Sequence, residues 1–101
     1  MAVDKAIIQV RPNTGVDWYE ATDSAKAYIQ TNYKDTGKIT NSADSVSGDG
    51  LTKTTTVTYN NSDSLMEFVT DATIITDFLE ARKTYNTNNS ITDNHNDLAI
   101  G

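Results

Sequence analysis

The sequence predicts an α+β fold in which an antiparallel sheet is covered on one face by helices. The strongest strand signal is residues 51–59, a threonine-rich segment that follows a Gly-Asp-Gly turn. On each side of this strand lies one segment with apolar residues at helical spacing. Helices laid on one face of a small sheet satisfy both patterns.

Residues 4–11 form the first predicted strand, because apolar residues recur at every second position from Ala6 to Val10. Pro12 has no backbone N–H for a neighbouring strand, so it ends this element. The first residues lack the basic and apolar regions of a signal peptide. No apolar run reaches the roughly 20 residues of a membrane span. We therefore expect no signal peptide and no membrane partner.

The first helix is predicted to begin near Asp17, because Asp17 and Glu20 have the spacing of a capping box. Apolar side chains then recur three and four residues apart from Trp18 to Ile29. Lys34 in the last turn and Gly37 just after it are a helix stop signal.

Residues 38–47 are predicted as a second strand, with a bulge, because the next turn leads directly into residues 51–59. A flexible loop is the alternative. In the strand 51–59, alternation separates a mixed face from a hydroxyl face. The mixed face carries Leu51, Lys53, Thr55, Val57 and Tyr59, and the hydroxyl face carries Thr52, Thr54, Thr56 and Thr58. We expect the mixed face to pack on the helices and the threonine row to meet a second copy or to border a pocket.

Residues 63–85 are open to two interpretations. A single helix would give a continuous apolar stripe but would place Ile74, Phe78 and Tyr85 on the opposite face. Two helices, at 63–70 and 73–84, would avoid this if Asp71 or Thr73 capped the second one.

We therefore predict one α+β domain, residues 1–91, followed by a polar C-terminal tail, residues 92–101. A short edge strand at 90–92 is possible in this scheme. The predicted order, βαββα with a final short strand, is the ferredoxin-like arrangement.

Two short segments carry a family resemblance: Ile7-Ile8-Gln9-Val10-Arg11-Pro12 and the helical stretch from Glu80 to Ile91. Within the ferredoxin-like order, they resemble dimeric α+β barrel proteins of the antibiotic-biosynthesis-monooxygenase type. The resemblance implies a homodimer whose sheets pack face to face. Haem-degrading members use a helical histidine, whereas the only histidine here, His95, lies in the predicted tail. The acidic, cysteine-free composition also resembles small proteins of marine tailed bacteriophages, which implies a cytoplasmic or virion-associated location.

Composition and charge exclude several classes of function. The formal charge is −6 and lysine and arginine are not clustered, so nucleic acid and anionic membranes are poor partners. Without cysteine, thiolate metal sites and cysteine nucleophiles are impossible. Asp93 to Asp97 resembles the start of a calcium loop, but Leu98 replaces the required glycine. We therefore predict no metal site, no cofactor and no catalytic residues.

Three residues are candidates for ligand binding. Trp18 and Tyr28 lie on the apolar stripe of the first helix, and Arg82 lies near the edge of the second stripe. They would line a pocket between sheet and helices, with Arg82 binding an anion. The alternative is that the aromatic residues belong to the core and that the Arg82 stem covers apolar surface.

These observations lead to two functional hypotheses. The first is a small non-enzymatic structural or interaction protein that forms a homo-oligomer through its sheet and can bind another protein. About a third of the residues are Thr, Asn and Ser, so a partner would complete a modest core. The alternative is a small-molecule-binding protein or cofactor-free enzyme of the dimeric α+β barrel type.

Overall fold

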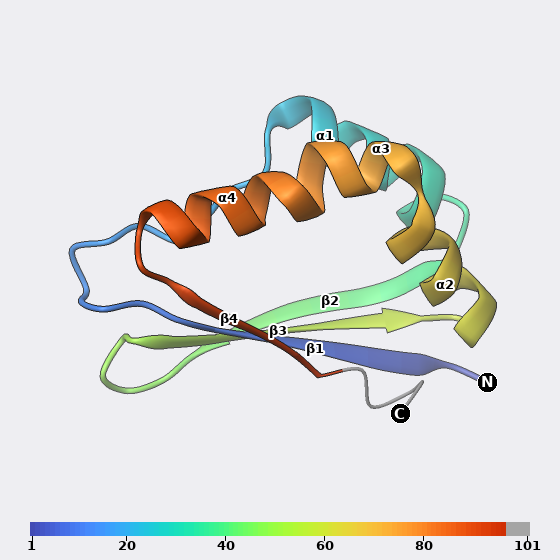
Figure 1. The fold of residues 1–101 in the computed structure, drawn as a ribbon. Coiled ribbons are helices and arrows are strands. Elements are labelled where there is room, and N and C mark those ends of the chain that lie inside the picture. The colour runs from blue at the N-terminus through green and yellow to red at the C-terminus, as the bar shows by residue number, and fades with distance from the viewer. Residues whose placement is uncertain (97–101) are drawn as a thin grey trace.

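Four antiparallel strands form one sheet in the order β2-β3-β1-β4, and the helices lie on one of its faces (Figure 1). The computed structural model describes the backbone of residues 1–96 and the side chains of residues 1–93. The elements in chain order are β1 (Val3–Val10), α1 (Asp23–Ile29), η1 (Gln30–Lys34), β2 (Ile39–Val46), β3 (Thr52–Tyr59), α2 (Ser62–Thr70), α3 (Ala72–Ile74), η2 (Ile75–Leu79), α4 (Glu80–Asn88) and β4 (Thr92–Asn96). The segments η1 and η2 are π-helical. The predicted α+β class is confirmed.

Strand β3 lies inside the sheet and pairs with β1 on one side and β2 on the other. Lys53, Thr55, Val57 and Tyr59 face the helices, and Tyr59 is only 2% exposed. Because side chains alternate along a strand, the threonine row faces away from the helices. The expected packed face is therefore correct, and the threonine row does not border the cavity described below.

The second strand also forms where it was predicted. Its pairing with β3 shifts between Ile39 and Asn41, which is the expected bulge. Ile39 is buried against the helices, whereas the rest of β2 is exposed. The β2–β3 turn requires the left-handed backbone of Gly50, whose φ is 76°. Strand pairing thus overrides the weak local propensity of residues 40–47.

The first helix begins later than predicted. Its N-cap is Thr22, whose hydroxyl oxygen accepts a hydrogen bond from the Ala25 N–H at 3.1 Å. Asp17 lies in the preceding loop, where its carbonyl accepts a 2.7 Å hydrogen bond from the Tyr85 hydroxyl. The expected capping box is wrong because this tertiary contact and the Thr22 cap replace it. The predicted stop is correct, since Gly37 has a φ of 79°.

Residues 62–88 form two helical pieces, as the second interpretation predicted. Asp71 has an extended backbone and ends α2, and its carboxylate accepts the Thr73 N–H at 2.9 Å to cap α3. Because the chain starts a new helical piece at Asp71, Ile74 and Phe78, four residues apart, share the face that packs against the core. The second piece continues without a break to Asn88.

The last strand lies in the segment that the sequence assigned to a polar tail. Thr92–Asn96 pairs with β1, whereas the expected short strand was at 90–92. Ser90 makes the turn with a φ of 58°, and Asp93 then reaches Arg82 in the interior. The remaining tail residues, 97–101, lie outside the described residues.

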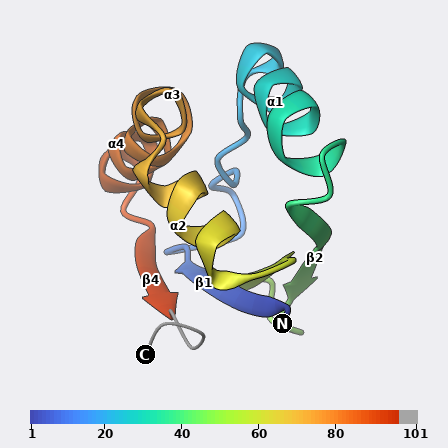
Figure 2. The ribbon, with the colours of Figure 1, turned by 90° about the vertical axis from the view of Figure 1, so that its right-hand side faces the viewer.

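The core is off-centre in the molecule. Its buried residues lie where α2 and η1 meet the adjacent ends of β2 and β3: Tyr33, Ile39, Tyr59, Leu65, Phe68 and Ile74. Toward the other end, α1 and α4 diverge above the sheet and the loop 11–22 passes between them (Figure 2).

Candidate functional site

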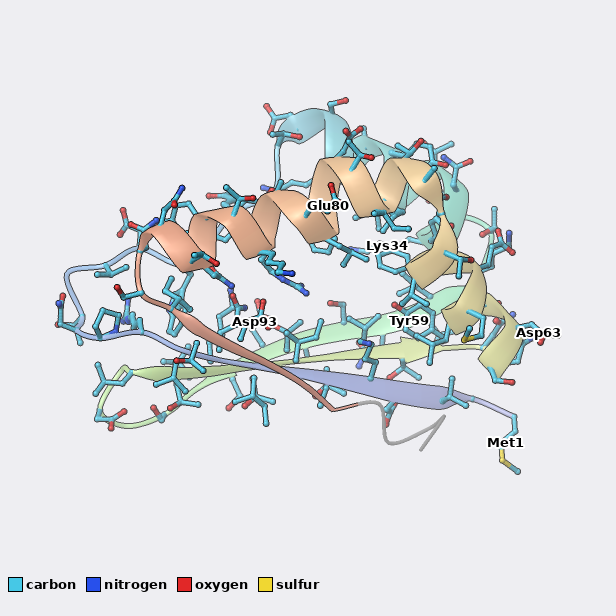
Figure 3. The ribbon with its side chains drawn as sticks, viewed as in Figure 1. Met1, Lys34, Tyr59, Asp63, Glu80 and Asp93 are labelled. Atoms are coloured by element: carbon cyan, nitrogen blue, oxygen red, sulfur yellow. The ribbon has the colours of Figure 1, made fainter. Side chains whose placement is uncertain are left out.

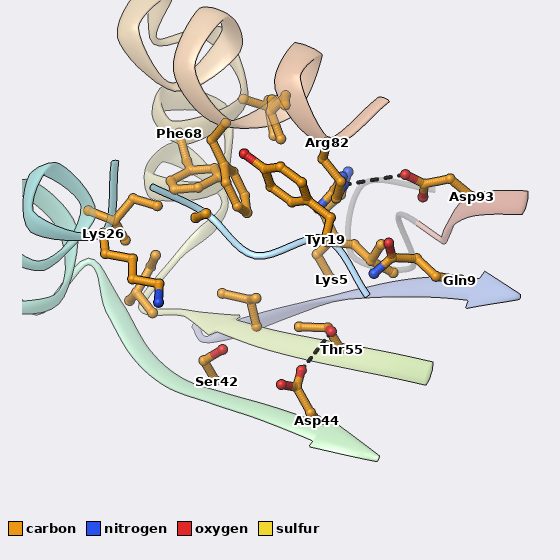
Figure 4. A pocket seen from close by; sticks show the side chains of 18 of the residues that line it. Lys5, Gln9, Tyr19, Lys26, Ser42, Asp44, Thr55, Phe68, Arg82 and Asp93 are labelled. Carbon is orange, nitrogen blue, oxygen red and sulfur yellow. Dashed lines mark hydrogen bonds and ion pairs between the residues drawn. The ribbon is translucent and has the colours of Figure 1, made fainter. Parts of the chain in front are cut away.

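A cavity of about 890 Å³ lies between the helix-covered face of the sheet and the helices (Figure 4). Its floor comes from β1, β2 and β3, and its walls come from the loop 11–22 and the helices. Figure 3 shows that Tyr59 and Asp93 point into the space between these layers. The cavity therefore involves every layer of the fold.

Apolar side chains form the part of the wall next to the core. Phe68 packs edge-on against Tyr59 and Phe78, with ring centroids 5.8 and 6.4 Å apart. Ile39 and Leu79 continue this surface. Such a surface favours the apolar part of an organic molecule.

A buried polar cluster forms the opposite wall. Arg82, on α4, is 5% exposed, and its Nε lies 3.3 Å from an Asp93 carboxylate oxygen. The Asn86 side-chain amide donates to the Gln9 side-chain oxygen Oε1 at 2.9 Å and to the Asp93 carboxylate at 3.1 Å. This network joins α4, β1 and β4 and fixes the Arg82 guanidinium in the wall.

Burial shifts the pKa of the Arg82 guanidinium below its ordinary value, and the charge of Asp93 opposes this shift. Because the ordinary pKa of arginine is above about 12, the side chain remains a cation at neutral pH. The Arg82 guanidinium also lies 5.3 Å from the centre of the Phe78 ring. It is therefore a fixed positive charge beside an aromatic surface.

The loop 11–22 brings Tyr19 to the cavity. Arg11 holds this loop by donating to the carbonyls of Gly50 and Val16, both at 2.8 Å. The Tyr19 ring lies 6.4 Å from Phe78, and its buried hydroxyl has no hydrogen-bond partner among the described residues. The Tyr19 ring thus lines the cavity, whereas its hydroxyl is buried away from it.

Of the three residues predicted from the sequence, the structure places Arg82 in the cavity wall. Trp18 is not among the lining residues. The Arg11 guanidinium lies over the Trp18 ring, 4.6 Å from the ring centre. Tyr28 also lies outside the lining, and its hydroxyl donates to Asp71 at 2.8 Å. The structure thus does not bring the three together.

Other lining residues were missed by sequence reasoning. Lys5 and Gln9 on β1 and Lys53 on β3 face inward among apolar neighbours. The sign of these lining residues in the sequence is a polar residue at a strand position whose side chain faces the helices. That signal becomes readable only once the pairing register and the covered face are known.

Asp71 forms a second polar centre, outside the cavity. Its carboxylate accepts the Tyr33 and Tyr28 hydroxyls at 2.7 and 2.8 Å. Burial, and next the hydrogen bond to Asp71, raise the pKa of Tyr33, so this hydroxyl stays protonated at neutral pH. The cluster links the first helical segment to the α2–α3 junction, which is a structural role.

Within residues 1–96, no helix combines the length and apolar character needed to cross a membrane. Among the described side chains, those of residues 1–93, no three His, Asp or Glu side chains gather as metal ligands. No protein-family model, curated protein or solved structure matches the chain. The geometry of the cavity is therefore the basis for a functional proposal.

Proposed function

We propose that the protein binds a small amphipathic molecule in the cavity between its sheet and its helices. The observation that carries the proposal is a cavity of about 890 Å³ with an apolar wall facing a buried polar one. Ligand sites in proteins commonly enclose roughly 300–1,000 Å³ and combine apolar walls with a few fixed polar groups. Arg82, Lys5 and Lys53 supply such groups here.

A site for a ligand is a better account of the cavity than incomplete packing. The cavity opens to solvent at a rim of exposed side chains, so its apolar wall would contact water unless a molecule covered it. A bound molecule with an apolar body and a polar end would cover this wall and contact the polar residues of the lining.

Titration with the uncharged dye Nile red tests this function. We expect saturable binding, with an increase in dye fluorescence, at one site per chain. Ala21→Phe would fill part of the cavity and weaken binding by about tenfold or more. Ala27→Phe is the matched control, because Ala27 is exposed on α1 and does not line the cavity. Absence of saturable binding, or equal loss in both variants, would contradict the proposal.

We also propose that the chain has the ferredoxin-like βαββαβ topology and is related to the dimeric α+β barrels. The strand order supports this, because β1 and β2 are joined by a helical crossover with β3 between them. Strands β3 and β4 are likewise joined by a helical crossover, with β1 between them.

A second proposed function is assembly into a homo-oligomer through the outer face of the sheet. This face carries Ala6, Ile8, Val10 and the threonine row, and no described helix covers it. Among the outward side chains of β1, β2 and β3, Asp4 is the charged one, and its carboxylate accepts a hydrogen bond from Thr58. The molecular mass in solution tests this assembly.

A further inference from the structure

We infer that the ligand of the cavity is an organic carboxylate with an apolar aliphatic or aromatic body. The inference deepens the proposed function and rests on it. Its starting point is the distribution of charge in an acidic chain with 14 acidic and 8 basic residues.

The residues lining the cavity reverse this balance. Six are basic: Lys5, Lys26, Lys34, Lys53, Arg82 and Lys83. Three are acidic: Asp44, Glu80 and Asp93. The lining thus has more basic than acidic residues in an acidic protein, although Lys26 pairs with Glu20 outside the lining and Lys53 lies 4.0 Å from Asp44.

The basic residues occupy two levels of the cavity. The rim carries the exposed Lys26, Lys34 and Lys83 together with the exposed acids Asp44 and Glu80, and Lys26 pairs with Glu20. Arg82, Lys5 and Lys53 lie deeper, and the Lys53 side chain is only 19% exposed. The charges at the rim largely offset one another, whereas the deeper cations are placed to bind an anion away from bulk water.

Arg82 is the best-placed group for a carboxylate. A guanidinium has five N–H donors, more than the two used in one bidentate pair, so Arg82 can retain Asp93 and bind a ligand. Figure 4 shows Lys5 and Tyr19 near Arg82, with Asp93 beside the guanidinium on the side away from Tyr19. Lys5 adds a second positive charge to this side of the cavity.

The apolar wall determines the rest of the ligand. Phe68, Phe78 and Leu79 offer no charged group, so a highly charged sugar or nucleotide would lose hydration there without compensation. A single carboxylate on a hydrocarbon body places its charge near Arg82 and its apolar part against these side chains.

Competition against Nile red with decanoate and decanol tests the inference. The two molecules share an alkyl chain and differ in charge. We expect decanoate to displace the dye at concentrations about tenfold or more below those of decanol at neutral pH. If Nile red binds and decanol competes as well as decanoate, the carboxylate inference fails and the proposed function stands. If no probe binds, the proposed function fails as well.

Matched variants assign the selectivity to the cavity. Lys5→Met and Lys53→Met should each reduce the preference for decanoate by about threefold or more while decanol binding is unchanged. Lys38→Met is the control, because Lys38 lies outside the lining and pairs with Glu67. The pair Arg82→Met with Asp93→Asn removes both charges of the buried ion pair and should abolish the preference. Circular dichroism verifies folding, and an unchanged preference in folded variants would overturn the inference.

Discussion

Asp71 connects two helical segments through one carboxylate. It accepts the hydroxyls of Tyr28 and Tyr33 and, from its own chain segment, the N–H of Thr73. Burial raises its pKa, but the hydrogen bonds from the two tyrosines and from backbone N–H groups outweigh burial and hold the pKa below its ordinary value. The ionised form is therefore the one that the fold stabilises.

Replacing Asp71 by alanine should lower the free energy of unfolding by about 2–3 kcal/mol, because a helix cap and a charge-assisted hydrogen bond to buried Tyr33 are lost. Chemical denaturation at neutral pH measures this difference. Asp77→Ala is the control: Asp77 is exposed on η2, and we expect a change within about 0.5 kcal/mol. Similar losses in both variants would contradict the role of Asp71.

The lowered pKa of Asp71 predicts that its contribution to the free energy of unfolding depends on pH. Since the folded state lowers the pKa of Asp71, its stabilisation is complete above the unfolded pKa, near about 3.9. It is lost as the pH falls through the lower folded value. The stability gap between wild type and Asp71→Ala should therefore be constant from about pH 5 to 7 and decrease below about pH 4.

At the scale of elements, the residues that follow the helical segments differ in how well they suit a left-handed backbone. Gly37 and Ser90 each follow a helical segment, and the φ angles of these two residues are positive, 79° and 58°. Glycine adopts this conformation freely, whereas other residues pay about 1 kcal/mol. Gly37 was recognisable from the sequence as a stop, and Ser90 was not, because serine carries no such preference.

Ser90→Gly should therefore stabilise the fold by about 0.5–1 kcal/mol, since it relieves the strain at this turn. Gly37→Ala should destabilise it by about 1 kcal/mol, although an added Cβ would meet no atom within 4 Å. Thermal unfolding of both variants checks the pair. Ser90→Ala is the control that removes the hydroxyl without giving conformational freedom, and a gain as large as that of glycine would contradict the argument.

Sequence patterns predicted most elements because alternation and helical spacing are local properties. They failed where a distant contact decided the outcome. The Tyr85 hydroxyl holds the Asp17 carbonyl in the loop. Asp93 enters the interior because Arg82 provides a cation and Asn86 a hydrogen-bond donor for its carboxylate. The cavity was anticipated through Arg82 alone, since Lys5, Gln9 and Lys53 converge only through strand register.

At the scale of the whole molecule, charge separates the two faces of the sheet. The helix-covered face carries Lys5 and Lys53, whereas the outer face of β1 and β3 carries Asp4 as its charged residue. Two copies with a charge of −6 each repel one another over most of their surface. The outer face is the place where they can meet with few opposing like charges, so a second copy is its expected occupant.

If the outer faces pair, the solution mass should be twice the 11.0 kDa of one chain at high protein concentration. Thr54 lies opposite Ile8 in the middle of this face, so Thr54→Glu would place two like charges near each other in the dimer and shift the mass toward the monomer. Ser24→Glu adds the same charge on exposed α1 and should leave the dimer intact. Sedimentation equilibrium distinguishes the outcomes, and a monomer at every concentration would exclude this assembly while leaving the cavity and its ligand unaffected.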